Sequence, residues 1–132
     1  MRALLLTLLL SSSGRAGQCD AVDCTWTVGM KLLREARYAE ALPWLEQGFR
    51  LSQDPKFLFE IGEAHRLAGK DAQAIVAYES YVKIAPYAAN LKEVEALLAE
   101  CRLRVEEQRA FFQPPPQRPD GAPMRSWDRA EA

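Results

Sequence analysis

The chain of 132 residues is poor in the side chains that build most catalytic and metal sites, since it has one histidine and three cysteines. A zinc site at His65 would need cysteine or carboxylate ligands that the sequence does not group around it. A serine–histidine triad there lacks a credible nucleophile. We therefore expect no catalytic residue, no metal and no cofactor.

Neither sign of charge dominates the sequence. The 17 Lys and Arg residues are scattered among 18 Asp and Glu residues, and the formal net charge is -1. Binding to a phosphate backbone requires a basic stripe or patch, so nucleic acid is not expected as a partner. The glycines build no phosphate-binding loop, because Gly62 is expected inside a helix and Gly69 at the end of one. A nucleotide or other small-molecule substrate is likewise not expected.

Long apolar runs are missing as well. The leucine-rich run within residues 1–10 follows Arg2 and stops at about half of the roughly 20 residues that a membrane-spanning helix needs. Small residues follow it from Ser11 to Gly17. This order is typical of a secretory signal peptide, which we predict over residues 1–17. The mature protein is then expected to be periplasmic or secreted, outside the cytoplasm of a bacterium.

The three cysteines bear on the same question. In an oxidising compartment a close pair usually cross-links, and Cys19 and Cys24 are close in the leader predicted over residues 18–24. We predict a disulfide between them and a buried, inert thiol at Cys101. Two alternatives stay open: lipidation of Cys19, although Gln18 stands where a small residue is usual, and a thiol oxidoreductase pair, although the spacing is not Cys-x-x-Cys.

An internal repeat organises the middle of the chain. Gly29 and Gly62 are separated by 33 positions, and so are Ala41 and Ala74. Apolar residues recur at matching offsets, which indicates two copies of one unit. Small residues at these positions allow two helices to approach closely, so we expect them at helix–helix contacts.

The second copy has clear helix boundaries. Asp54 can cap a helix whose first residue is Pro55, and Gly69 can supply the left-handed residue that ends it. Asp71 can cap a second helix, which Pro86 follows. Residues at helical spacing are expected to face the core in the two helices: Leu58, Ile61, Gly62, His65 and Leu67, then Ala74, Ile75, Tyr78, Val82 and Ile84.

These residues resemble the tetratricopeptide repeat family, a bacterial secreted or envelope form of it. The positions that carry the resemblance in the second copy are Leu58, Ile61, Gly62, His65, Gly69, Ala74, Tyr78, Tyr81 and Pro86. His65 stands where the family usually has Tyr, and Tyr81 where it usually has Ala. In the first copy Val28, Gly29, Leu32, Tyr38, Ala41 and Leu45 match. There Ala36 replaces the turn glycine and Gly48 replaces a later alanine.

The resemblance implies an all-α fold, a short α-solenoid of two helix-turn-helix units. We place the repeat domain at 25–110, with the first repeat at about 22–54 and the second at about 55–88. Pro43 inside the first repeat predicts a bend. A capping helix is expected at about 90–110, where Asn90 and Glu93 form a capping-box pattern. The proline-rich segment 111–132 is expected to be a disordered tail that ends in solvent, and a spacer or a polyproline ligand is the alternative.

The family uses its first helices to line a concave binding face, and this implies the contact residues. Matching the family's face positions one by one gives Trp26, Met30, Leu33, Arg34, Lys56, Phe59, Glu63 and Arg66. Trp26, Met30 and Phe59 have the character of apolar interface anchors. Alternatively, Trp26 and Phe59 cover each other or fold under the leader. The family's clamp for a terminal carboxylate is not carried over, because the Lys and Asn residues it uses are missing here.

The expected function is a non-catalytic scaffold that binds a protein or peptide partner in the bacterial envelope. An alternative is a lipid-anchored assembly subunit of an envelope complex, and a more remote one is the thiol oxidoreductase. Two repeats with one cap are near the lower limit for a stable array. Formation of a homodimer or attachment to a larger subunit would supply the missing burial.

Overall fold

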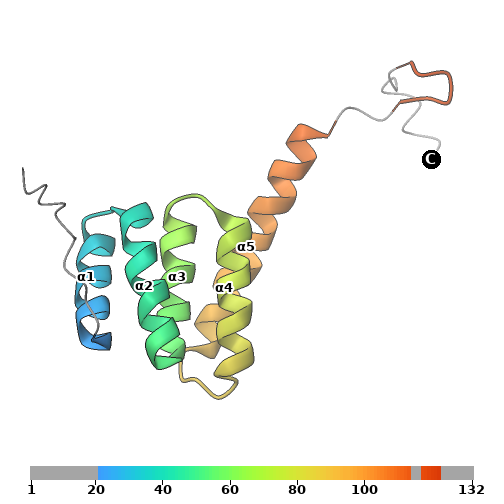
Figure 1. Cartoon of the computed structure of the whole chain (residues 1–132). Helices are drawn as coiled ribbons and strands as arrows, with labels where there is room; N and C mark the ends of the chain where they lie inside the picture. The colour runs from blue at the N-terminus through green and yellow to red at the C-terminus, as the bar shows by residue number, and fades with distance from the viewer. Residues whose placement is uncertain (1–20, 114–116, 123–132) are drawn as a thin grey trace, which may run out of the picture.

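The fold is all-α, as expected. The computed structural model describes residues 21–113 and 117–122, and that part of the chain contains five α-helices (Figure 1). Their bounds are α1 (Val22–Arg34), α2 (Tyr38–Ser52), α3 (Pro55–Leu67), α4 (Asp71–Ile84) and α5 (Leu91–Phe112).

Each helix packs against the next one in the sequence. Figure 1 shows α1 to α4 side by side, with α5 leaving the group at its C-terminal end. The core consists of two groups of buried residues. One joins α1, α2, α3 and α4 through Leu32, Ala41, Leu45, Phe57, Ile61 and Ala77. The other joins α3, α4 and α5 through Leu58, Ala74, Tyr78, Tyr81, Val94, Leu98 and Cys101.

The two glycines of the repeat lie where helices approach closely. A methyl group placed on Gly29 would lie 2.7 Å from Leu45 Cδ2, on the neighbouring α2. One placed on Gly62 would lie 2.5 Å from Tyr78 Cε1, on the neighbouring α4. Ordinary contacts of such a carbon begin at about 3.4 Å. Any larger residue at either position would therefore force the Leu45 side chain or the Tyr78 ring to move within the core.

The two departures of the first copy from the family have visible consequences. Ala36, in place of the turn glycine, adopts a left-handed conformation with a φ of 57°. A methyl group placed on Gly48, which stands in place of alanine, would lie 2.2 Å from Phe57 Cε1 and 2.6 Å from Thr25 Oγ1. Because Phe57 and Thr25 are both fully buried, they occupy the space that an alanine would need.

The boundaries of α3 are confirmed. The Asp54 side chain accepts a hydrogen bond of 2.9 Å from the backbone N–H of Lys56, and Pro55 is the first residue of the helix. At the other end, Gly69 follows the last turn with a φ of +74°. These local signals fix the helix without help from the rest of the chain.

Two predicted caps are wrong. Asp71 is the first residue inside α4 rather than its cap, and its carboxylate accepts a 2.7 Å hydrogen bond from Arg104 of α5. Asn90 precedes α5 but makes no capping bond with its side chain. Its Oδ1 instead accepts a 2.6 Å hydrogen bond from the hydroxyl of Tyr81. In both cases a tertiary partner takes the oxygen that the local pattern assigned to a helix end.

Some core and boundary predictions also need correction. Leu67 and Ile84 are about half exposed, because each stands in the last turn of its helix, beyond the packed contact. The last helix continues to Phe112, so Phe111 and Phe112 belong to α5 and not to the tail. Pro43 lies exposed within α2, and the helix continues through it. A bend at Pro43 stays a prediction.

Several predictions fall on other parts of the chain. The signal peptide over 1–17 and Cys19 lie outside the described residues, as do 114–116 and 123–132 of the predicted tail. Cys24 lies in α1. The Cys19–Cys24 disulfide stays a prediction, because Cys19 is not among the described residues. Among the residues that the structure describes, none of the helices has the length and apolar character needed to cross a membrane.

Candidate functional site

The residues matched to the family's binding face come from two helices. We call them the helix-A face: Trp26, Met30, Leu33 and Arg34 on α1, with Lys56, Phe59, Glu63 and Arg66 on α3. Spacings of three and four place each set on one side of its helix. The structure joins the two sets at one point, where Lys56 Nζ lies 4.7 Å from the centre of the Trp26 ring. This distance is that of a cation–π contact.

The aromatic residues of the helix-A face are partly covered by the bundle itself. Trp26 contacts Phe57 edge to face at 5.2 Å between ring centres. Phe59 contacts Tyr78 at 6.1 Å and Tyr81 at 5.8 Å. Trp26 and Phe59 thus have different aromatic neighbours, and both remain half-buried. Their orientation is set by packing, while part of each ring stays accessible.

Glu63 and Arg66 form an ion pair within the face. Arg66 donates to both carboxylate oxygens of Glu63, at 3.1 and 2.7 Å, and the Tyr78 hydroxyl donates to the same carboxylate. Burial alone would raise the pKa of Glu63, but these hydrogen bonds outweigh it and the pKa is lowered. Burial and the Glu63 contact raise the pKa of Tyr78. Glu63 is therefore charged at neutral pH, and its charge is already balanced by Arg66.

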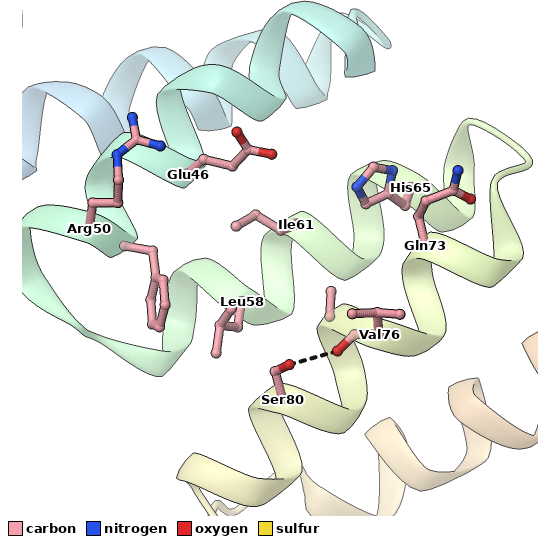
Figure 2. A pocket seen from close by; sticks show the side chains of 10 residues that line it. Glu46, Arg50, Leu58, Ile61, His65, Gln73, Val76 and Ser80 are labelled. Atoms are coloured by element: carbon pink, nitrogen blue, oxygen red, sulfur yellow. Dashed lines mark hydrogen bonds between the residues drawn. The ribbon is translucent and has the colours of Figure 1, made fainter.

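A second surface lies over α2, α3 and α4 and was not predicted. It is a hollow of about 430 Å³, which we call the α2–α3–α4 hollow. Its lining residues are Glu46, Phe49, Arg50, Leu58, Ile61, His65, Gln73, Val76, Ala77 and Ser80. Figure 2 shows Leu58 and Ile61 on α3 in the middle, between Arg50 of α2 and Val76 of α4. The hollow is mainly apolar, with polar side chains around it.

The hollow and the helix-A face use different sides of α3. At about 100° per residue, Leu58, Ile61 and His65 point roughly opposite to Phe59 and Glu63. The sequence pattern assigned the first three to the core, and Leu58 and Ile61 are buried while His65 is half-buried. The pattern gave little sign of a hollow between α2 and α4. One signal was available: Val76 is apolar but shares a helical face with Gln73 and Ser80, and it is 64% exposed.

His65 is the most unusual polar group of the hollow. Its Nδ1 is buried and has no hydrogen-bond partner among the described residues. Burial lowers the pKa of His65, the positive charge of Lys70 lowers it further, and Glu46 opposes the shift. The imidazole is therefore neutral at neutral pH. The sequence pattern predicted that His65 faces the core, and the structure places it half-buried in the lining of the hollow.

Cys101 belongs to a cluster at the contact of α4 and α5. Arg104 donates to Asp71 Oδ1 at 2.9 and 2.7 Å and lies 3.4 Å from the Cys101 sulfur. The Arg104 hydrogen bonds hold the pKa of Asp71 below its usual value. Burial and the contact with Asp71 raise the pKa of the Cys101 thiol. Cys101 is a free and buried thiol, so its prediction as a buried residue is confirmed.

The described residues contain no group of three or more His, Cys, Asp or Glu side chains placed to hold a metal ion. Comparison with protein-family models, with curated proteins and with solved structures gave no match.

Proposed function

We propose that the chain is a tetratricopeptide-like helical repeat that acts as a non-catalytic scaffold and binds a protein partner through the helix-A face. The observation that carries this proposal is the equivalence of its two helical hairpins. Gly29 meets Leu45 in the α1–α2 pair, and Gly62 meets Tyr78 in the α3–α4 pair. The two glycines are 33 positions apart, one fewer than the roughly 34 residues of a tetratricopeptide repeat.

The chemistry of the helix-A face supports a polypeptide as its partner. Its apolar members Trp26, Met30, Leu33 and Phe59 are half-buried, so each keeps accessible surface in a fixed orientation. Aromatic anchors with limited freedom lose little entropy on binding. Arg34 and Lys56 are exposed beside them and supply a polar rim. An amphipathic helix or an extended peptide with apolar side chains suits this arrangement.

The proposed place of action is the bacterial envelope, after removal of residues 1–17. This part of the proposal depends on the leucine-rich run and the small residues that follow it. A scaffold of two hairpins and one closing helix buries little surface of its own. Permanent association with a partner would therefore also stabilise it.

The test is capture of the partner by variants of the face. Trp26→Ala combined with Phe59→Ala is expected to reduce crosslinked partner at least about tenfold, as for two anchors of 1 kcal/mol or more. Tyr87→Ala combined with Leu103→Ala is the matched control, because both residues are exposed and lie outside the face. Circular dichroism verifies that all variants remain helical. Unchanged capture by the folded Trp26/Phe59 variant would remove the face from the proposal.

A further inference from the structure

The C-terminal end of α5 exposes two large aromatic side chains. Phe111 and Phe112 are 84% and 80% exposed, and their rings contact each other edge to face at 5.5 Å. We call this pair the α5 tip. Paired aromatic residues left so open on a helix end are a typical anchor for another surface.

The α5 tip extends away from its own bundle. Arg104 bonds to Asp71 of α4, and Phe112 lies eight residues further along the same helix, about 12 Å at 1.5 Å per residue. Figure 1 shows this end of α5 pointing away from α2 and α3. The tip of an intact α5 therefore does not fold back into the α2–α3–α4 hollow of the same molecule.

The hollow offers an apolar surface against which the α5 tip can pack. Phe49, Leu58, Ile61 and Ala77 give it an apolar lining, and a volume of about 430 Å³ falls in the range of sites that enclose ligand groups. An aromatic side chain has the right chemistry for this lining.

One charged group at the hollow, Arg50, also matches a helix C-terminus. The last helical hydrogen bond of α5 runs from Gln113 N–H to the Arg109 carbonyl, so the carbonyls after Arg109 lie beyond it. Helix ends of this kind carry partial negative charge and need donors. Arg50 is exposed at the hollow and makes no ion pair with another described residue. Glu46, which also lines the hollow, carries the opposite charge, so the carbonyls of a docked helix end must face Arg50 and not Glu46.

We propose that the α5 tip of one molecule docks into the α2–α3–α4 hollow of a second copy of this chain, with Phe111 and Phe112 on the apolar lining and the helix-end carbonyls facing Arg50. The two docking surfaces differ, so the contact is heterologous and each copy can both donate a tip and accept one. Head-to-tail chains or rings follow. The helix-A face takes no part and stays free for another partner.

The contact is small, which sets the conditions of the test. Two aromatic side chains bury about 150–250 Å² each, less than the roughly 800 Å² per partner of a standard stable interface. We therefore expect association in the micromolar range or weaker. The measurement is sedimentation velocity of the purified chain, processed as it is in its cells. The protein concentration runs from about 5 to about 500 µM, roughly tenfold below to tenfold above the expected dissociation constant.

Two variants and their mixture decide the question. Phe111→Ala combined with Phe112→Ala removes the tip, and Val76→Glu places a charge at an exposed position of the hollow. Each alone is expected to weaken self-association at least about tenfold. An equimolar mixture retains one intact tip and one intact hollow, so it is expected to form a 1:1 heterodimer and nothing larger. Tyr87→Ala, at an exposed residue outside both surfaces, serves as the control and should assemble as the unchanged chain does.

Three outcomes would overturn the proposal. The first is an unchanged chain that remains monomeric at the highest concentration. The second is assembly that depends on the tip but not on Val76, which would indicate a symmetric tip-to-tip contact. The third is a mixture of the two variants in which no heterodimer forms although circular dichroism shows both to be folded.

Discussion

Replacing Gly62 by alanine tests the close helix contact on which the repeat interpretation depends. The added methyl group would lie 2.5, 2.7 and 3.0 Å from three atoms of the Tyr78 ring. Tyr78 is fully buried, and its hydroxyl is bonded to Glu63. The ring would have to move by most of an ångström in a filled core. Such overpacking costs about 1–3 kcal/mol.

An opposing effect has to be separated from this cost. Alanine is favoured over glycine inside a helix by about 1 kcal/mol. The net loss of stability from Gly62→Ala is therefore expected to be the difference between the two effects, up to about 2 kcal/mol. That would lower the melting temperature by about 4–8 °C for each kcal/mol lost.

A second background isolates the contact. In a Tyr78→Leu chain the ring is gone, so Gly62→Ala should keep only the helix gain and stabilise by about 1 kcal/mol. The difference between the two backgrounds then measures the overpacking itself, about 1–3 kcal/mol. Urea unfolding followed by circular dichroism gives all four free energies. Equal effects of Gly62→Ala in both backgrounds would show that the ring and the glycine do not touch.

Two further predictions concern charged groups. Asp71→Asn should lower the free energy of unfolding by about 1–3 kcal/mol at pH 7, because Arg104 loses a buried charged partner. Since the folded-state pKa of Asp71 is lowered, this loss should vanish as the pH falls below about 3.9 and through the lowered pKa. A urea midpoint that is the same for both chains at pH 7 would refute the prediction. His65 has a lowered pKa, so the unfolded chain binds its proton more readily and the unfolding free energy should decline as the pH falls through about 6.5. His65→Gln should remove that part of the decline, and a pH profile identical to that of the unchanged chain would contradict the assignment.

Local signals in the sequence were enough for much of the fold. Asp54, Pro55 and Gly69 act on neighbouring backbone groups, so the bounds of α3 could be predicted without knowledge of the tertiary structure. The all-α class was implied by the resemblance to the tetratricopeptide repeat family. Gly29 and Gly62 were expected at close helix contacts for a steric reason, and both lie at such contacts.

The failures occur where a distant residue competes with a local one. Asp71 was a reasonable cap, but Arg104 is 33 positions away and offers a stronger, charged partner. The Asn90 oxygen is taken by Tyr81, the large residue found where the family usually has alanine. The space around Gly48 is likewise decided by Phe57, which belongs to another helix.

The hollow could not be predicted for a related reason. Its lining residues belong to three helices, and the size of the hollow depends on the distance between α2 and α4. A helical pattern identifies Leu58 and Ile61 as apolar and inward-facing, but it does not say how completely the neighbours cover them. Only the exposed Val76 gave a local indication.

Site-specific photo-crosslinking in the producing cells tests the central claim most directly. A photoreactive residue at Arg34 or at Lys56 probes the helix-A face from α1 and α3, and one at Lys92 on α5 is the control; all three positions are exposed. We expect the positions on the face to form adducts with one and the same envelope protein, and the control position to form none with it. The claim would be contradicted by adducts that are no more frequent at Arg34 and Lys56 than at Lys92, or by unrelated proteins at the two positions.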